Sequence, residues 1–208
     1  MKRTSQTIAE RESMRQSILE KAHALFMEQG FHKTSLRSLA RALDCSPGTI
    51  YLYFKDKDEL WSEIQNRAFE PFFQQLSEAA RSEDPVKRLR DIACAYVDFA
   101  LDMPQHYELM FLQQAPMNAD QNAEHWNNGK LAHDLLARTI QDCLDQGRVA
   151  PGEPELMTFN CWSHVHGMCA LVLRGRTRFY HDINHRSMLH RAVEDYINRI
   201  QTAKTHGK

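Results

Sequence analysis

Residues 46–60 read SPGTIYLYFKDKDEL, and the interpretation of the whole chain starts from this stretch. Ser46 is a good helix cap because its hydroxyl can accept a hydrogen bond from the first helical turn. Pro47 suits the first helical position, where its missing N–H would have no partner. Small residues, two tyrosines and two lysines follow in close succession. The stretch therefore predicts a short helix that presents hydroxyl and ammonium groups.

Two helices are predicted before this stretch. Apolar residues recur with helical spacing over residues 14–26, and Gly30 ends that helix. The next helix has apolar residues at i, i+3, i+4 and i+7 from Leu36, and either Thr34 or Ser35 can cap it. A tight turn then leads to Ser46. Three helices with this spacing predict a helix-turn-helix, whose second helix enters a DNA major groove.

The fourth helix begins at residues 56–59, where DKDE forms a capping box, and its apolar positions run from Leu60 to Leu76. Pro71 falls inside it. Since proline removes one backbone hydrogen bond, we expect a bend or a break there. The alternative is a plain helix end followed by a new helix.

The remaining sequence is also read as helical, with no convincing strand. The expected elements are a helix from Asp84-Pro85 to Pro104, a short helix over 105–113, a loop within 115–128, a helix over 131–144, a turn at 147–154, a helix over 155–174 that is apolar nearly all round, and a last helix with its stripe over 189–200. The predicted fold class is all-α, with about nine helices.

The composition excludes several classes of protein. The chain has 208 residues, of which 42% are hydrophobic and 25% charged, so it can bury a core. No apolar run approaches the ~20 residues of a membrane-spanning helix, and the first residues lack the apolar stretch of a signal peptide. Five cysteines without a CxxC pair favour reduced thiols over disulfides or a zinc site. We therefore expect a cytoplasmic protein without membrane association.

Charge is distributed unevenly along the chain. Residues 1–57 contain ten Lys or Arg against six Asp or Glu, whereas residues 58–208 contain sixteen against twenty-one. A polyanion would prefer the first part, although an excess of this size also arises by ordinary scatter. We predict a DNA-binding domain at 1–57 and a second helical domain at 58–208.

The stretch from Ile18 to Ile64, ILEKAHALFMEQGFHKTSLRSLARALDCSPGTIYLYFKDKDELWSEI, resembles the N-terminal domain of the TetR family of transcriptional regulators without a gap. The matching positions are Phe26, Gly30, Phe31, Thr34, Leu39, Ala40, Ser46, Thr49, Tyr51, Phe54, Lys57 and Leu60. The resemblance implies a repressor whose dimer binds a palindromic operator on double-stranded DNA. It also implies a larger C-terminal helical domain that binds a small, mostly apolar effector and forms the dimer.

The resemblance also implies which residues contact DNA. Thr34 would touch phosphate, and Arg37 would read a guanine edge. Three residues at the start of the recognition helix would approach bases, and the tyrosines and lysines after them would hold phosphates. These seven are Pro47, Gly48, Thr49, Tyr51, Tyr53, Lys55 and Lys57. The alternative for Arg37 is a surface charge paired with a carboxylate; for the others it is turn residues, core aromatics and solvated lysines.

The turn before the recognition helix departs from the family pattern. The family usually has glycine and then a small apolar residue, whereas this chain has Asp44 and Cys45. The position requires a left-handed backbone, which aspartate tolerates with some strain.

The last two helices are the implied homodimer interface. A helix that is apolar nearly all round, such as 155–174, must be covered on more than one side, either by a second subunit or within the monomer. Residues 162–167, WSHVHG, are similar to the Trp…His-Gly signature of one subgroup of TetR C-terminal domains. Gly167 costs helix stability, which suggests close approach of a neighbouring helix or a ligand.

The family further implies an effector pocket among the central helices. Its expected lining consists of Phe99, Met103, Tyr107, Met110, Phe111, Leu135, Trp162, His166 and Cys169. Aromatic and methionine side chains adapt to apolar ligands, but at helical spacing they also serve as ordinary core. We expect no metal and no cofactor, since His164 and His166 do not share a helix face and no nucleophile or phosphate-loop motif is present. The competing hypothesis is a helical carrier or enzyme whose helix-turn-helix is incidental.

Overall fold

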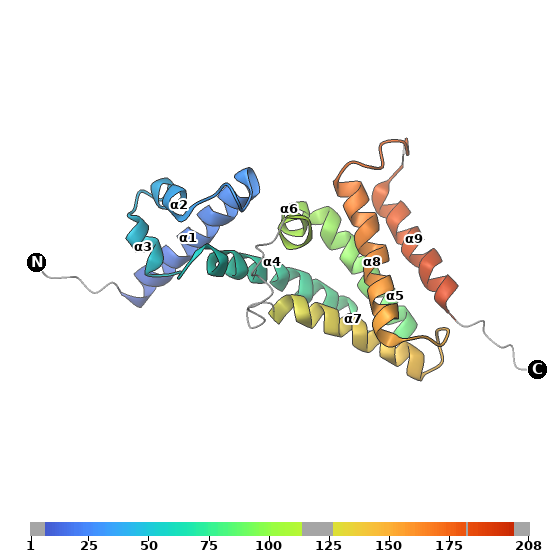
Figure 1. Cartoon of the computed structure of the whole chain (residues 1–208). Helices are drawn as coiled ribbons and strands as arrows, with labels where there is room; N and C mark the ends of the chain where they lie inside the picture. Colours follow the sequence, from blue (N-terminus) through green and yellow to red (C-terminus); the bar gives the residue numbers. More distant parts are fainter. Residues whose placement is uncertain (1–6, 114–126, 182, 202–208) are drawn as a thin grey trace, which may run out of the picture. The chain divides into compact units, whose positions relative to one another are not determined.

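A computed structural model describes residues 7–113, 127–181 and 183–201. These residues form nine α-helices, one π-helical segment and no strand, so the fold is all-α. The helices are α1 Ile8–Gln29, α2 Leu36–Ala42, α3 Pro47–Tyr51, α4 Lys57–Ala79, α5 Pro85–Asp102, α6 Pro104–Tyr107, α7 Asn127–Asp145, α8 Pro154–Leu173 and α9 His185–Ile200, and the π-helical segment η1 is Glu108–Leu112 (Figure 1).

The chain divides into two compact units. One comprises Met1–Ala68 and Leu109–Asn127, and the other Phe69–Glu108 and Asn128–Lys208. The division falls within α4, which contributes its first half to one unit and its second half to the other. The domain boundary that the sequence predicts between residues 57 and 58 stays a prediction.

The first unit is built around α1. Thr7 caps this helix through a reciprocal pair of hydrogen bonds with Glu10, and Gly30 ends it with φ +82°, a conformation that glycine adopts freely. The buried residues of α1 face α2 and the start of α4. Phe26 packs against Trp61, with ring centroids 5.2 Å apart, and both side chains are fully buried. These aromatic contacts fix the scaffold that carries the two short helices.

The turn between α2 and α3 has the expected left-handed residue. Asp44 has φ +51°, and it is a non-glycine residue in a region that glycine favours. Ser35 rather than Thr34 caps α2, and Ser46 caps α3 with Pro47 at its first position. The prediction of a helix-turn-helix with a strained aspartate in its turn is therefore confirmed.

Helix α4 runs unbroken through Pro71. The expectation of a break at this residue, and the alternative of a helix end, are both wrong, whereas a bend at Pro71 stays a prediction. Proline removes one hydrogen bond from a helix of 23 residues, and burial beyond the proline holds the chain in place. Phe72 packs edge-to-face against Tyr96 and Phe99, with ring centroids 5.2 Å and 5.1 Å away.

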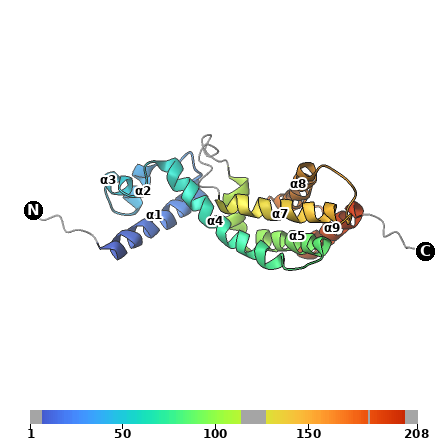
Figure 2. The same ribbon diagram turned by 90° about the horizontal axis from the view of Figure 1, so that it is seen from below.

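The second unit is centred on α5, which packs against both α8 and α9 (Figure 2). Asp84 caps α5 by accepting hydrogen bonds from the amides of Val86 and Lys87, and the helix ends before Pro104 as predicted. The expected short helix over 105–113 is found as α6 followed by the π-helical η1. The loop expected within 115–128 lies almost entirely outside the described residues.

None of the helices in the described ranges combines the length and the apolarity that crossing a membrane requires.

Candidate nucleic-acid interface

The amino end of α3 is open to solvent. Ser46, Pro47 and Gly48 are exposed, and Thr49 is half-buried. Ser46 Oγ accepts a hydrogen bond from the Thr49 amide at 3.2 Å and lies 3.0 Å from its hydroxyl. The cap thus holds the first turn rigid and leaves its outer surface uncovered. A helix start with free N–H groups and positive dipole end suits an anion such as phosphate.

Gly48 has no structural reason to be glycine. Its backbone does not adopt a positive φ, and an added Cβ would meet Ser46 Oγ at 3.6 Å, an ordinary van der Waals distance. Glycine within a helix is less stable than alanine by roughly 1 kcal/mol. The small residue therefore leaves room for a molecule that approaches from outside the chain.

Two large side chains project from the end of α3. Tyr51 is 58% exposed and Leu52 is 72% exposed, while Ile50 and Phe54 are fully buried. Tyr53 is half-buried. Leu52 was not predicted as part of the site. In the sequence, Leu52 lies two residues after the core residue Ile50 and two residues before the core residue Phe54. This spacing is the signal that predicts an outward-facing side chain at Leu52.

Arg37 and Lys55 offer positive charge on exposed positions. Throughout the described ranges no other side chain forms an ion pair with either residue. Arg37 lies in the first turn of α2 and is exposed, outside the buried face formed by Leu36, Leu39 and Ala40. The paired-charge alternative for Arg37 is therefore not supported, and both cations are available to a polyanion.

The side chain of Thr34, which was predicted to touch phosphate, is buried within the first unit. It is 3% exposed, and its hydroxyl donates to the carbonyl oxygen of Gly30 at 3.0 Å. Its amide donates to Phe31 O. Thr34 closes the turn between α1 and α2, and the exposed cap residue beside it is Ser35.

Lys57 is also engaged within the unit. Its ammonium donates to Phe31 O at 2.9 Å and to Thr34 O at 3.0 Å, and it lies 3.9 Å from the centre of the Phe31 ring. The ammonium of Lys57 is therefore bound within the unit, whereas Lys55 is exposed.

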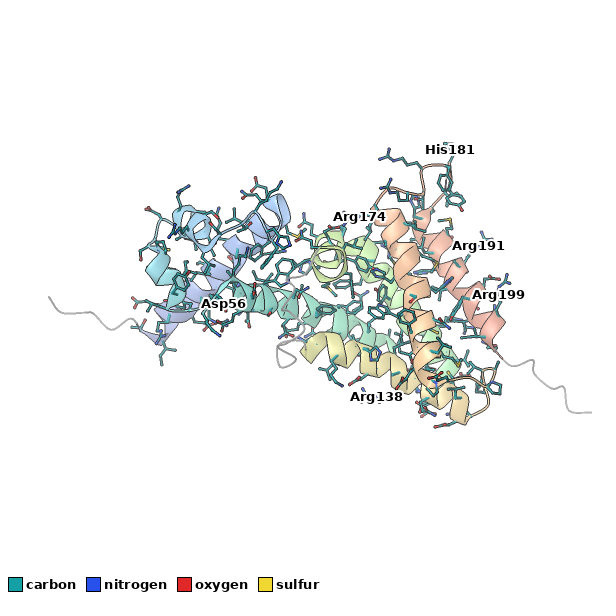
Figure 3. The ribbon with its side chains drawn as sticks, in the orientation of Figure 1. Asp56, Arg138, Arg174, His181, Arg191 and Arg199 are labelled. Atoms are coloured by element: carbon teal, nitrogen blue, oxygen red, sulfur yellow. The ribbon has the colours of Figure 1, made fainter. Side chains whose placement is uncertain are left out.

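The start of α4 is capped by Asp56, which Figure 3 labels near the N-terminal end of this helix. Asp56 Oδ1 accepts a hydrogen bond from the Glu59 amide at 2.8 Å. The Glu59 carboxylate accepts from the Lys55 amide rather than from that of Asp56. The predicted capping box is thus present, but Glu59 accepts its hydrogen bond from the residue before the cap, Lys55, and not from Asp56 itself.

A polar cluster lies inside the second unit. The hydroxyl of Tyr107 lies 2.8 Å from His166 Nδ1, and the Tyr96 hydroxyl lies 3.2 Å from the same nitrogen. Burial lowers the pKa of His166, which favours the neutral imidazole. Burial raises the pKa of Tyr107 above its ordinary range. Trp162 contacts the cluster edge-on, with its ring centroid 6.4 Å from that of His166.

The other predicted effector residues are divided between the two units. Phe99 and Cys169 are buried in the second unit, and Met103 and Leu135 are half-buried there. Met110 is buried and Phe111 half-buried, and both belong to the first unit. Of the nine residues, Tyr107, Trp162 and His166 belong to the polar cluster, and Cys169 lies close enough to Tyr107 to influence its pKa. The full set stays a prediction.

Helix α8 leaves an apolar face uncovered. Leu156, Phe159 and Leu171 are each more than half exposed. On the same side of the helix, a Cβ added to Gly167 would meet no described atom within 4 Å. The described residues therefore do not support the alternative in which the monomer covers this helix on all sides. Figure 3 shows Arg191 and Arg199 extending from one side of the neighbouring α9.

The five cysteines are free thiols. Burial raises the pKa of Cys94 and of Cys143 to about 11, and that of Cys169 to about 12, so these thiols stay protonated at neutral pH. Within the described residues no group of three or more His, Cys, Asp or Glu side chains could hold a metal ion.

Comparison with known families accounts for both units. Residues 18–64 match "Bacterial regulatory proteins, tetR family", and residues 89–196 match "Tetracyclin repressor-like, C-terminal domain". The second match alone spans about half of the chain. The chain belongs to the TetR family. A TetR protein of this kind is a DNA-binding transcriptional regulator. The similarity to the Trp…His-Gly subgroup stays a prediction.

Individual relatives agree with this assignment. The chain is 28% identical over 150 residues to the probable acrEF/envCD operon repressor of Escherichia coli K12, which covers 69% of this chain and 68% of that protein. It is 47% identical over 58 residues to the regulator AcrR of Shigella flexneri, covering 28% of this chain and 27% of that protein. A solved TetR-family regulator from Shewanella sp. PV-4 has a TM-score of 0.70 at 22% identity, covering 91% of this chain and 98% of that one. The last likeness supports the fold alone.

Proposed function

We propose that this TetR-family protein is a repressor that binds its operator through the exposed face of α2 and α3. We call this face the reading face and define it by Arg37, Pro47, Gly48, Thr49 and Tyr51. The observation that carries the proposal is the open amino end of α3. There Gly48, whose backbone conformation and surroundings would also accept alanine, lies between the cap Ser46 and the exposed Tyr51. Lys55 and Tyr53, next along the chain, would contact phosphates beside the bases.

Each member of the reading face has a separate task. Arg37 would donate two hydrogen bonds to the O6 and N7 atoms of a guanine. Pro47 and Gly48 would let the start of α3 approach the bases closely, and the Thr49 methyl would contact a thymine methyl. Tyr51 would donate its hydroxyl to a phosphate. Phosphate contacts fix the register, while base contacts select the sequence.

The operator complex would contain a dimer. One helix-turn-helix reads few base pairs, and two related by two-fold symmetry read half-sites about one helical turn apart. The uncovered face of α8, with Leu156, Phe159 and Leu171, would pack against the same face of a second subunit together with α9. Gly167 would permit close approach of the two copies of α8, since no atom of the described residues lies within 4 Å of a Cβ added there.

Release from DNA would follow binding of a small, mostly apolar effector in the second unit. Tyr107 and His166 would supply the polar contact that orients the effector among apolar side chains. Effector and operator would favour different arrangements of the two reading faces, so each would weaken binding of the other. On this proposal the protein acts in the cytoplasm and catalyses no reaction.

Footprinting of genomic fragments bound by the purified protein tests the proposal. We expect protection of a palindromic site, with affinity that falls steeply as salt rises. The genes beside the protected site then indicate the chemical class of compounds in which to search for the effector. Micromolar binding to all DNA alike, without a protected site, would contradict the proposal and favour the incidental helix-turn-helix of a carrier or an enzyme.

A further inference from the structure

We propose that Lys57 is a positioning residue for DNA binding, which fixes the start of α2 against α4, and that it is not a phosphate contact. The inference rests on the proposed function, because it concerns how the reading face is held in place. It departs from the expectation that Lys57 would grip the DNA backbone like Lys55.

At most one of the three N–H groups of the Lys57 ammonium is left for a phosphate. A lysine ammonium has three N–H groups. Two of them donate to Phe31 O and Thr34 O at 2.9 Å and 3.0 Å, and the face of the Phe31 ring lies 3.9 Å from Nζ. A phosphate oxygen would therefore have to reach the one remaining N–H group beside the Phe31 ring, or displace one of the two carbonyl partners.

The two carbonyl groups belong to the connection between α1 and α2. Phe31 in this connection is buried against Phe26 and Trp61, with ring centroids 5.6 Å and 5.1 Å away. Thr34 is buried and precedes Ser35, which caps α2. Because Lys57 is the first residue of α4, its side chain ties the start of α4 to the start of α2. The position of Arg37, in the first turn of α2, depends on this tie.

The location of Lys57 is unfavourable for the helix itself. A positive charge at a helix N-terminus opposes the helix dipole, whereas Asp58 and Glu59 in the same turn complement it. The internal contacts of Lys57 explain why a cation is stable there. Lys55, two residues earlier, is exposed and forms none of the contacts that Lys57 forms.

The test compares Lys57→Met with Lys55→Met, since methionine retains an unbranched apolar stem but removes the charge. The dissociation constant of the 208-residue protein for a selected genomic fragment is measured between about 50 and 200 mM salt. The temperature is set where circular dichroism shows each variant fully folded. Hydrogen exchange of the amides at residues 31–36 is measured in parallel, to report on the connection directly.

We expect Lys57→Met to raise the dissociation constant by about tenfold at every salt concentration, with an unchanged slope of log affinity against log salt. Exchange at residues 31–36 should accelerate. Lys55→Met should instead reduce the slope by roughly 0.9 for each phosphate that the protein no longer neutralises. If Lys57→Met reduces the slope as Lys55→Met does, Lys57 is a phosphate contact and the inference is wrong.

An unchanged dissociation constant for folded Lys57→Met would also overturn the inference, because Lys57 would then contribute to stability alone. These outcomes differ from a failure of the proposed function. In that case the wild-type protein itself would show no salt-dependent preference for the selected fragment.

Discussion

Replacing Gly48 with alanine should weaken operator binding while the fold remains intact. The added Cβ meets Ser46 Oγ at an ordinary van der Waals distance of 3.6 Å, so the isolated protein has room for it. Alanine also restricts the unfolded chain and favours the helix, which should raise the free energy of unfolding by about 0.5 kcal/mol. Stability and DNA affinity are therefore expected to change in opposite directions.

The decrease in affinity follows from steric crowding at the bases. Adding a methyl group to a closely packed contact costs roughly 1–3 kcal/mol. With about 1 kcal/mol at each of two half-sites, the dimer should bind about 2 kcal/mol less tightly, which corresponds to roughly a 30-fold higher dissociation constant. Gly48→Leu should weaken binding more than Gly48→Ala, since leucine is larger and also a good helix former.

The assay is a titration of a protected genomic fragment, with thermal unfolding of the same samples as the control for the fold. The slope of log affinity against log salt should stay unchanged, because every phosphate contact remains. If Gly48→Ala and Gly48→Leu both bind the fragment as tightly as the wild-type protein, the start of α3 does not approach DNA closely, and the reasoning about the reading face is refuted.

Three further predictions concern other parts of the chain. Arg37→Ala should cost about 1–3 kcal/mol and relax the preference at one base position, measured on fragments with each base substituted; a uniform loss on all sequences would make Arg37 a phosphate contact. Gly167→Leu should leave the subunit folded but shift the scattering mass at micromolar concentration from dimer to monomer; an unchanged dimer mass would exclude close packing at this glycine. Glu63→Gln should lower the free energy of unfolding by about 1 kcal/mol at pH 7. Burial raises the pKa of Glu63, but hydrogen bonds from Arg15 and Arg67 outweigh it and hold the pKa below its ordinary value of 4.5. This contribution is present above pH 4.5 and is lost as pH falls through the lowered pKa, so the two unfolding curves should converge in acid; a gap that persists there would contradict the ion-pair explanation.

The helix boundaries were predictable because their signals are local. Caps such as Ser46 and Asp84, and the end of the first helix at Gly30, depend on a few neighbouring residues, and the structure has them where the sequence predicts them. The strain at Asp44 was predictable for the same reason. The absence of a break at Pro71 was not predictable, because it depends on packing between residues far apart in the chain, above all that of Phe72 against α5.

The site was only partly predictable for a related reason. Exposure on a short helix follows from its period, so the outward direction of Arg37, Gly48 and Tyr51 could be inferred, and that of Leu52 could have been. The roles of Thr34 and Lys57 could not. Both are polar residues whose hydrogen bonds close inside the unit, to carbonyl groups up to 26 positions away in the chain. Sequence position alone does not reveal such partners.

The central claim is that the reading face contacts DNA, and photocrosslinking tests it most directly. A benzophenone amino acid replaces either Tyr51, which is 58% exposed on the reading face, or Tyr180, which is 49% exposed in the second unit. Each protein is irradiated with the fragment that the wild-type protein protects. The account predicts covalent protein–DNA adducts from position 51 and none from position 180. Equal yields from both positions, or adducts from position 180 alone, would contradict it.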